Sequence, residues 1–257
     1  MGSTELLFQT DSYQTSFEAK ITAVRPDGGL VLDRTLFYYT SGGQPCDKGK
    51  IKRMSDGAQA EVVEVKKMDG EVVHYLQAPA SPPAPGTEAA LSTLSTPSFS
   101  PGDSVHGEID WARRQRLMRM HTAGHVLSAV FFAKGVLITG NQLDLHQSRF
   151  DFSMEEFDRS LIDSVISEAN RLCAEGHAVK VYSLPREEAL KLPGFVKLAN
   201  ALPPALSVLR IVEIEGVDTQ ADGGTHVHNA REVGTVELVK VENKGAKNRR
   251  IYFTLKP

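Results

Sequence analysis

The chain has 257 residues, of which 41% are hydrophobic and 24% are charged, with 29 lysines and arginines against 32 aspartates and glutamates. This composition is that of a folded globular protein, and a formal net charge of −3 excludes a strongly basic nucleic-acid-coating protein. Two cysteines, Cys46 and Cys173, are too few for a disulfide framework. Because no signal pattern and no run of about 18 apolar residues occurs, we expect a cytoplasmic, reducing location and no membrane contact.

The first part of the chain has the pattern of short antiparallel strands. Apolar and polar residues alternate over residues 17–24, 28–33, 60–68 and 71–76. Glycine-bearing turns separate these segments, which favours a small barrel or sandwich. Residues 79–101 then hold six of the thirteen prolines and almost no charge, so we interpret them as a mobile loop or insertion. We expect an N-terminal β-barrel domain over residues 1–106.

Helical periodicity begins after this loop. Asp110 is a plausible N-cap for a helix that ends at Gly135, and its predicted inward stripe is Leu117, His121, His125, Ala129 and Phe132. A second predicted helix starts at a capping box of Ser153 and Glu156 and ends at Gly176, with an inward stripe of Phe157, Leu161, Val165, Ala169 and Cys173. Strands are predicted at residues 178–183, 207–216, 234–242 and 249–255. The fold class is therefore α+β, with a mainly antiparallel sheet packed by helices over residues 107–257.

Two segments carry candidate metal ligands. His121 and His125, in HTAGH, are four residues apart on a predicted helix, so both rings lie on one face and can chelate one ion. The spacing is equally compatible with two ordinary core or surface histidines. In DGGTHVH, Asp222 and His226 flank a tight glycine turn and supply an oxygen and a nitrogen, although such a turn is by itself usually only a turn.

A third segment, residues 32–49, contains the glycine-rich loop SGGQ. Ser41, Gly42 and Gly43 give a flexible backbone whose N–H groups can bind a phosphate or an oxyanion, and Gln44 adds a polar side chain. By composition alone the loop is compatible with a plain hairpin turn.

Together, HTAGH, DTQADGGTHV and TLFYYTSGGQPCDKG resemble the editing module of alanyl-tRNA synthetase, and more closely its free-standing AlaX relatives. The flanking RRQRLMRM, SRFDF and ENKGAKNRRI are also similar. The resemblance implies a trans-editing deacylase that hydrolyses mischarged alanine tRNA, seryl- and possibly glycyl-, by metal-assisted ester hydrolysis. It implies that His121, His125 and His226 bind one zinc ion.

The chain departs from the family pattern at one position, because Asp222 stands where the family motif Cys-Gly-Gly-Thr-His has cysteine. Asp222 preserves the formal charge of the ligand set but is a harder ligand than a thiolate, so a weaker preference for zinc and loss of the metal both stay open. His228 is the rival fourth ligand, and we rank it below Asp222.

The same resemblance suggests residues for the substrate. Gln44 and Thr35 are the candidate catalytic residues, with Thr35 expected to bind the amino-acid hydroxyl and the Ser41–Gly43 backbone expected to hold the substrate. Basic residues near the motifs are expected to contact tRNA phosphates: Arg149, Lys247, Arg249 and Arg250.

Two other functions remain open from the sequence. One is a non-catalytic tRNA-binding protein whose editing site has degenerated at Asp222, and the other is a metal-dependent hydrolase of a different small ester or amide. No obligate protein partner is inferred.

Overall fold

The computed structural model describes residues 4–78, 97–154, 158–192, 206–245 and 248–256. The chain divides into two compact units, one formed by residues 1–41 and 45–114 and the other by residues 42–44 and 115–257. Within the described ranges, no helix has both the length and the apolarity needed to cross a bilayer.

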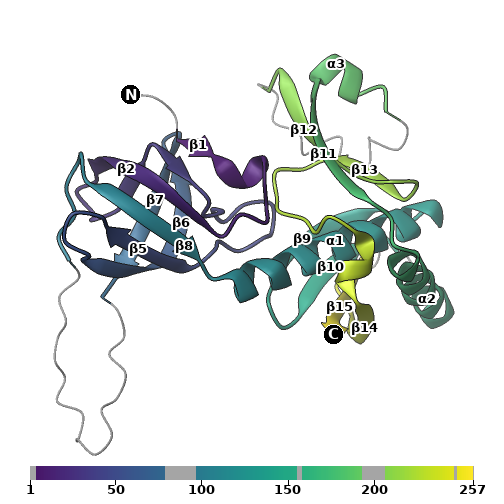
Figure 1. The fold of residues 1–257 in the computed structure, drawn as a ribbon. Coiled ribbons are helices and arrows are strands. Elements are labelled where there is room, and N and C mark those ends of the chain that lie inside the picture. The colour runs from purple at the N-terminus through teal and green to yellow at the C-terminus, as the bar shows by residue number, and fades with distance from the viewer. Residues whose placement is uncertain (1–3, 79–96, 155–157, 193–205, 246–247, 257) are drawn as a thin grey trace, which may run out of the picture. The chain divides into compact units, whose positions relative to one another are not determined.

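The first unit is built on a closed antiparallel barrel, as the sequence predicts (Figure 1). Its strands follow the order β2-β3-β7-β6-β5-β8. The bounds are β2 (Ser16–Val24), β3 (Leu30–Leu32), β5 (Gly49–Arg53), β6 (Gln59–Met68), β7 (Glu71–Gln77) and β8 (Ser104–Ile109). A short parallel pair, β1 (Glu5–Leu6) with β4 (Arg34–Thr35), and a 3-10 turn, η1 (Leu7–Gln9), complete this unit.

Alternation of side chains explains why these segments form a barrel. In β2, Phe17, Ala19 and Ile21 point into the core while the intervening residues are exposed. Phe17 pairs with Gly107 of β8, where an added Cβ would lie 2.3 Å from the Phe17 ring, so the glycine makes room for the aromatic side chain. Strands β5 and β8 were not predicted because they carry too few apolar residues to produce a strand pattern.

The proline-rich stretch needs one correction. Residues 79–96 lie outside the described residues, but residues 97–101 are ordered and belong to the barrel. Phe99 is buried in the barrel core, and the guanidinium of Arg53 lies 5.5 Å from the centre of its ring. Arg53 also donates a 2.6 Å hydrogen bond to the carbonyl of Ser98. The interpretation of 79–101 as one mobile loop is thus wrong at its C-terminal end, because a single aromatic residue anchors it.

A buried arginine fixes both ends of the loop that contains SGGQ. Arg114 is fully buried; its guanidinium forms an ion pair with Asp47 and donates to the carbonyls of Leu36 and Ser12. Asp47 also accepts a 2.7 Å hydrogen bond from the backbone N–H of Tyr38. Because a buried charge is tolerated only when it is paired and hydrogen-bonded, this network specifies the loop conformation strongly.

The second unit contains two antiparallel sheets, with α1 between them (Figure 1). The four-stranded sheet has the order β14-β15-β10-β9, and the three-stranded sheet has the order β11-β12-β13. The bounds of its helices are α1 (Trp111–Ala133), whose first turn belongs to the first unit, α2 (Arg159–Glu175), α3 (Arg186–Ala189) and the 3-10 turn η3 (Ala230–Val233). The strands are β9 (Ile138–Gln142), β10 (Ser148–Phe152), β11 (Val179–Pro185), β12 (Val208–Ile214), β13 (Asp218–Ala221), β14 (Thr235–Asn243) and β15 (Arg249–Lys256).

Helix α1 is buried almost all round rather than along one stripe. Asp110 caps its N-terminus, as predicted, by accepting a 3.0 Å hydrogen bond from the N–H of Arg113. Phe132 is 38% exposed and Phe131 is fully buried, so the stripe prediction is wrong at Phe132. A Cβ at Gly124 would lie 2.4 Å from the Phe150 ring, so this glycine lets the four-stranded sheet approach the helix closely.

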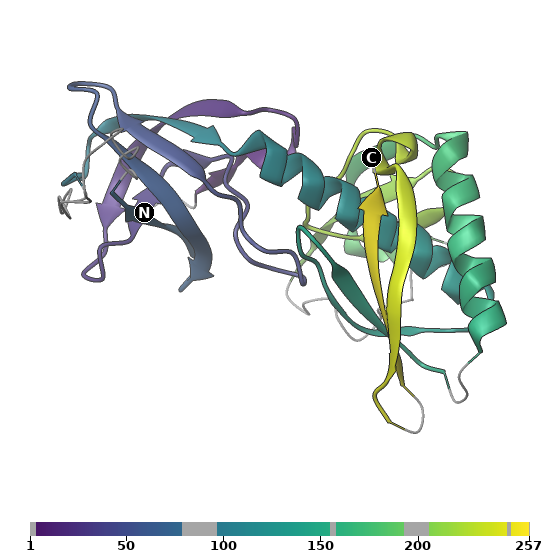
Figure 2. The ribbon, with the colours of Figure 1, turned by 90° about the horizontal axis from the view of Figure 1, so that it is seen from below.

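Helix α2 lies beside β14, the edge strand of the four-stranded sheet (Figure 2). Its N-cap is Asp158, whose carboxylate accepts a 2.8 Å hydrogen bond from the N–H of Leu161. The predicted cap at Ser153 is wrong, because the Ser153 hydroxyl instead accepts the N–H of Leu137. The other half of that box, Glu156, and the stripe residue Phe157 lie outside the described residues. Gly176 ends the helix with a φ of 82°, as predicted. The buried face of the described helix consists of Ile162, Val165, Ala169 and Cys173, so Ile162 takes the inward place predicted for Leu161.

Candidate metal centre

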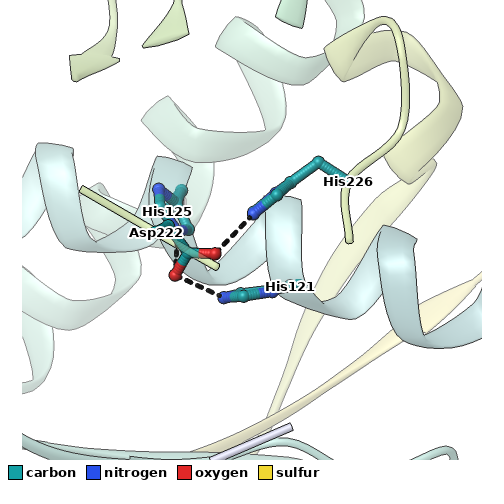
Figure 3. A group of neighbouring side chains, drawn as sticks. All are labelled: His121, His125, Asp222 and His226. Carbon is teal, nitrogen blue, oxygen red and sulfur yellow. Dashed lines mark hydrogen bonds and ion pairs between the residues drawn. The ribbon is translucent and has the colours of Figure 1, made fainter. Parts of the chain in front are cut away.

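Four side chains from two distant parts of the sequence converge in the second unit. His121 and His125 lie one turn apart on α1, while Asp222 and His226 follow β13. One donor atom from each lies within 4.8 Å of the other three. Figure 3 shows the Asp222 carboxylate between the three imidazole rings. His228, the rival ligand, is exposed and is not a member of this group.

All three histidines present the same ring nitrogen to the carboxylate. Oδ2 of Asp222 lies 3.4 Å from Nε2 of His121 and 3.7 Å from Nε2 of His125, and Oδ1 lies 3.3 Å from Nε2 of His226. Donors bound tetrahedrally at about 2.0–2.1 Å from a zinc ion are separated by roughly 3.3–3.4 Å. The oxygen–nitrogen distances are close to this separation but involve both oxygens of the carboxylate, and the four donors lie within 4.8 Å of one another. This spacing is compatible with one small divalent ion.

The opposite nitrogen of each ring is held by a buried polar side chain. Nδ1 of His121 lies 2.9 Å from Oε1 of Gln44, and Nδ1 of His125 lies 2.9 Å from Oδ2 of Asp218. Nδ1 of His226 lies 3.1 Å from the hydroxyl of Thr122. The oxygens of Gln44 and Asp218 can only accept, so they place a proton on Nδ1 of His121 and His125, whereas the hydroxyl of Thr122 orients the ring of His226 without fixing its tautomer. All three Nε2 atoms face the centre.

The glycine turn places Asp222. The N–H of Gly224 donates a 2.5 Å hydrogen bond to Oδ1 of Asp222, and Arg210 donates to the carbonyls of both residues. A Cβ at Gly224 would lie 2.3 Å from Cε1 of His121. Gly224 is therefore needed for close approach to the imidazole, whereas an added Cβ at Gly223 would meet nothing within 4 Å.

Burial and mutual contacts shift the pKa values of the clustered residues even without an ion. Burial acts to lower the pKa of His125, but hydrogen bonds to Asp218 and Asp222 outweigh burial and raise this pKa to about 9. Burial acts to raise the pKa of Asp222, but His121 and hydrogen bonds from the three histidines hold it well below its usual range. Burial, followed by the charge of His121, holds the pKa of His226 well below its usual value. Asp222 is thus kept as an anion at the centre.

The SGGQ loop reaches this cluster through Gln44, which is fully buried. Besides accepting from His121, Gln44 donates a 2.9 Å hydrogen bond from Nε2 to the hydroxyl of Thr225. Gly42 and Gly43 have φ values of 58° and 84°, which glycine adopts readily, and Gly43 accepts a 2.8 Å hydrogen bond from the N–H of Leu143. Gln44 therefore orients a ring in this structure, and binding of substrate by Ser41, Gly42 and Gly43 stays a prediction.

Thr35 lies in the barrel and is fully buried. Its hydroxyl accepts the N–H of Phe37 at 3.0 Å and lies 2.9 Å from Nε2 of His74. Nδ1 of His74 lies 3.1 Å from the carbonyl of Leu30. The hydroxyl of Thr35 is therefore used inside the barrel, and its role toward an amino-acid hydroxyl stays a prediction.

The basic residues predicted to bind phosphates differ in their burial and in their partners. Arg149 and Arg250 lie on the polar face of the four-stranded sheet, and both contact Asp151, Arg250 with two bonds of 2.6 and 2.8 Å. Arg249 is buried and donates to Asn243 and Gly245, so it holds the β14–β15 turn. Lys247 lies outside the described residues.

Several residues of the cluster were missed in the sequence. Asp218 and Gln220 sit at alternate positions of β13 and are both buried, and Thr122 and Thr225 are fully buried beside the ligands. The signal for Asp218 and Gln220 was a period of two in DTQA just before the glycine turn, since inward polar residues of a strand next to metal ligands are candidates for holding them. Thr122 and Thr225 carried no comparable signal.

Comparison with known proteins places these features in a family context. The profile of the threonyl and alanyl tRNA synthetase second additional domain matches residues 209–252, and that of class II (A) tRNA synthetases matches residues 7–113. The chain is 45% identical over 254 residues to the alanyl-tRNA editing protein AlaX-M of Methanosarcina acetivorans, covering 98% of this chain and 99% of the relative.

Two further relatives extend the comparison. Identity to AlaX-M of Saccharolobus solfataricus is 41% over 257 residues, with 99% of this chain and 100% of that protein covered. An alanine–tRNA ligase of Methanococcus vannielii is 35% identical over 246 residues, which is 94% of this chain but 25% of the ligase. The similarity thus includes both the barrel and the unit that holds the histidine–aspartate cluster.

Proposed function

This chain belongs to the AlaX-M family of alanyl-tRNA editing proteins, and from this premise we propose that it hydrolyses mischarged alanine tRNA in trans, at a metal ion held by the histidine–aspartate cluster. The observation that carries the proposal is the convergence of four donors on one point. A tRNA substrate also implies that the protein works in the cytoplasm. The same convergence argues against a degenerate, purely tRNA-binding protein, because a decayed site has no reason to keep four oriented donors.

The donor set suits a divalent ion, for which we propose zinc. Three imidazole nitrogens and one carboxylate oxygen are normal zinc ligands, and a carboxylate keeps the single negative charge of the cysteine that the family motif has at position 222. When bound, such an ion polarises the ester carbonyl and lowers the pKa of water. The residues of the chain hold the ion and orient its ligands. Asp222 and the three histidines bind the ion, and Gln44 fixes the ring of His121.

The proposed substrate is the ester between serine and the terminal adenosine of alanine tRNA, with glycine as a second candidate. The small apolar pocket in which a synthetase selects alanine rejects a ligand with an added hydroxyl by only about 10²-fold. Serine that is wrongly attached to alanine tRNA must therefore be removed at a second site. A site that must hydrogen-bond the serine hydroxyl rejects alanine by up to roughly 10⁴–10⁵-fold, because its buried polar groups would otherwise be left unpaired. We therefore propose that the site hydrolyses seryl-tRNA and spares alanyl-tRNA.

Contact with the tRNA is proposed for the polar face of the four-stranded sheet. Arg149 and Arg250 lie on it, with Lys240 paired across from Tyr252 and Lys244 beside Glu242. These four cations face two carboxylates, those of Asp151 and Glu242, so a positive excess remains for phosphates.

The experiment compares hydrolysis of seryl- and alanyl-tRNA made with the same alanine tRNA. We expect the purified protein to release serine at least 100-fold faster than alanine. His125→Ala should abolish the release because it removes a donor, while Asp163→Asn, on the exposed surface of α2, should hydrolyse seryl-tRNA at the wild-type rate. Equal rates for the two esters, or hydrolysis of neither, would refute the proposed function.

A further inference from the structure

Asp218 is a buried carboxylate next to the candidate metal ligands that is itself outside the ligand group. It begins β13, pairs with Ile214 of β12 and has a side chain with no exposed surface. Gln220, two residues later, points the same way and is also buried. An ionised carboxylate in such a place is costly unless specific partners compensate it, so its partners indicate why it is there.

The partners of Asp218 connect it to His125. Oδ2 lies 2.9 Å from Nδ1 of His125 and accepts a second 2.9 Å hydrogen bond from Nε2 of Gln220. An ionised carboxylate can only accept, so Nδ1 must carry the proton of this bond. In the neutral form that can bind an ion, the lone pair is then on Nε2, the atom that lies 3.7 Å from Oδ2 of Asp222.

The three histidines differ in the chemistry of their partners. His121 is held by the amide of Gln44 and His226 by the hydroxyl of Thr122, which are both neutral. Among the described contacts at Nδ1 of these rings, only that of His125 is made by a carboxylate. A negative charge behind a ligating imidazole makes the ring a stronger donor to a cation and fixes its orientation.

The geometry points to Asp218 as a positioning residue that sets the metal affinity of the site through His125, with Gln220 holding its carboxylate. This inference rests on the proposed function, since it requires that the cluster bind an ion. The competing interpretation is purely structural: Asp218 would anchor β13 to α1 whether or not an ion is bound.

The test measures metal binding directly by titrating the chelated protein with Co²⁺ and following the visible absorption of the bound ion. Asp218→Asn keeps the size of the side chain but removes the charge, and its amide can donate to Nδ1 and so favour the wrong tautomer. We expect roughly 10- to 100-fold weaker Co²⁺ binding and an altered absorption band. Gln220→Leu should weaken binding by a smaller factor, and Asp163→Asn is the matched control with wild-type binding.

Denaturant unfolding with and without Co²⁺ separates the two interpretations. A positioning role predicts that Asp218→Asn loses stabilisation by Co²⁺, because that stabilisation follows the affinity. Wild-type Co²⁺ affinity in Asp218→Asn, or equal destabilisation with and without the ion, would overturn the inference. If that variant does not fold, wild-type affinity and spectrum in Gln220→Leu would overturn it instead. No Co²⁺ binding by the wild-type protein would refute the metal site of the proposed function and this inference with it, whereas binding that is unaffected by Asp218→Asn refutes the inference alone.

Discussion

The side chain at position 222 determines the chemical character of the proposed metal site. Its carboxylate is held by Gly224 and faces three Nε2 atoms, so the local backbone already presents it as a ligand. Oxygen is a harder donor than the sulfur found at this place in the family motif, and it forms a shorter bond to zinc, about 2.0–2.2 Å against 2.3 Å. The replacement therefore preserves charge and changes softness.

Substitution at this position gives a direct prediction. Asp222→Ala should weaken zinc binding by at least 10-fold and lower deacylation in parallel, because it removes the anionic donor. Asp222→Cys should retain the ion and shift the preference toward zinc over harder ions, since a thiolate is softer. Competition titrations of zinc against manganese measure the zinc affinity and the metal preference, and a deacylation assay on the same preparations measures the activity. Full metal content and activity in Asp222→Ala would show that Asp222 is not a ligand.

His74 provides a residue-scale prediction in the barrel. Burial lowers the pKa of His74 to about 4, well below its ordinary value of 6.5. The unfolded chain therefore binds a proton between these two values that the folded barrel does not, and folding stability falls as the pH drops from 6.5 to 4. The full loss is about 3 kcal/mol.

The variant His74→Gln should remove this contribution. Its urea unfolding free energy should lie closer to that of the wild type at pH 4.5 than at pH 7.5, because the wild type loses stability on acidification that the variant does not have to lose. A constant difference between the two proteins at both pH values would contradict the assigned pKa.

At the scale of elements, the β14–β15 hairpin has two different faces. Ile251 and Phe253 point into the core, while Arg250 and Tyr252 face outward with Lys240 of β14. Arg249 is the exception among the basic residues, because its guanidinium is used to close the turn. A substitution of Arg249 would therefore change the stability of the hairpin and would not report on the RNA contact.

The RNA contact is tested by Lys240→Ala combined with Lys244→Ala. Both ammonium groups are exposed and interact with Glu242, a partner that phosphates can replace. We expect weaker tRNA binding and a salt dependence whose slope decreases by somewhat under one for each lost phosphate contact. Lys180→Ala, an exposed lysine paired with Glu215 on the other sheet, should leave the slope unchanged. An unchanged slope in the double variant would exclude this face from the RNA contact.

Elements with strong periodicity were predictable from the sequence, and elements defined by tertiary contacts were not. The cap at Asp110, the end of α2 at Gly176 and the strands of the barrel with clear alternation all follow from local rules. Strand β13 was missed because its inward residues, Asp218 and Gln220, are polar. The true cap of α2 at Asp158 was missed because two candidate capping residues lie five positions apart and only the packing decides between them.

At the scale of the whole molecule, sequence motifs up to about 180 residues apart meet in one network. Gln44 hydrogen-bonds both His121 and Thr225, and His121 faces Asp222, so three motifs share one polar cluster. The four donors were predicted from the sequence, and the alternation in DTQA carried a signal for Asp218 that went unused. Thr122 and Thr225 carried no such signal, since their role depends on how α1 packs against the segment after β13. We propose that this network works as a metal-dependent deacylase.

The most direct measurement of that claim is the rate of seryl-tRNA hydrolysis by one protein preparation before chelation, after chelation and after zinc is restored stoichiometrically. We predict that chelation lowers the rate by at least 100-fold, that one equivalent of zinc restores it, and that His121→Ala treated in the same way regains nothing. Full hydrolysis by the chelated protein, confirmed to contain no metal, would contradict the account.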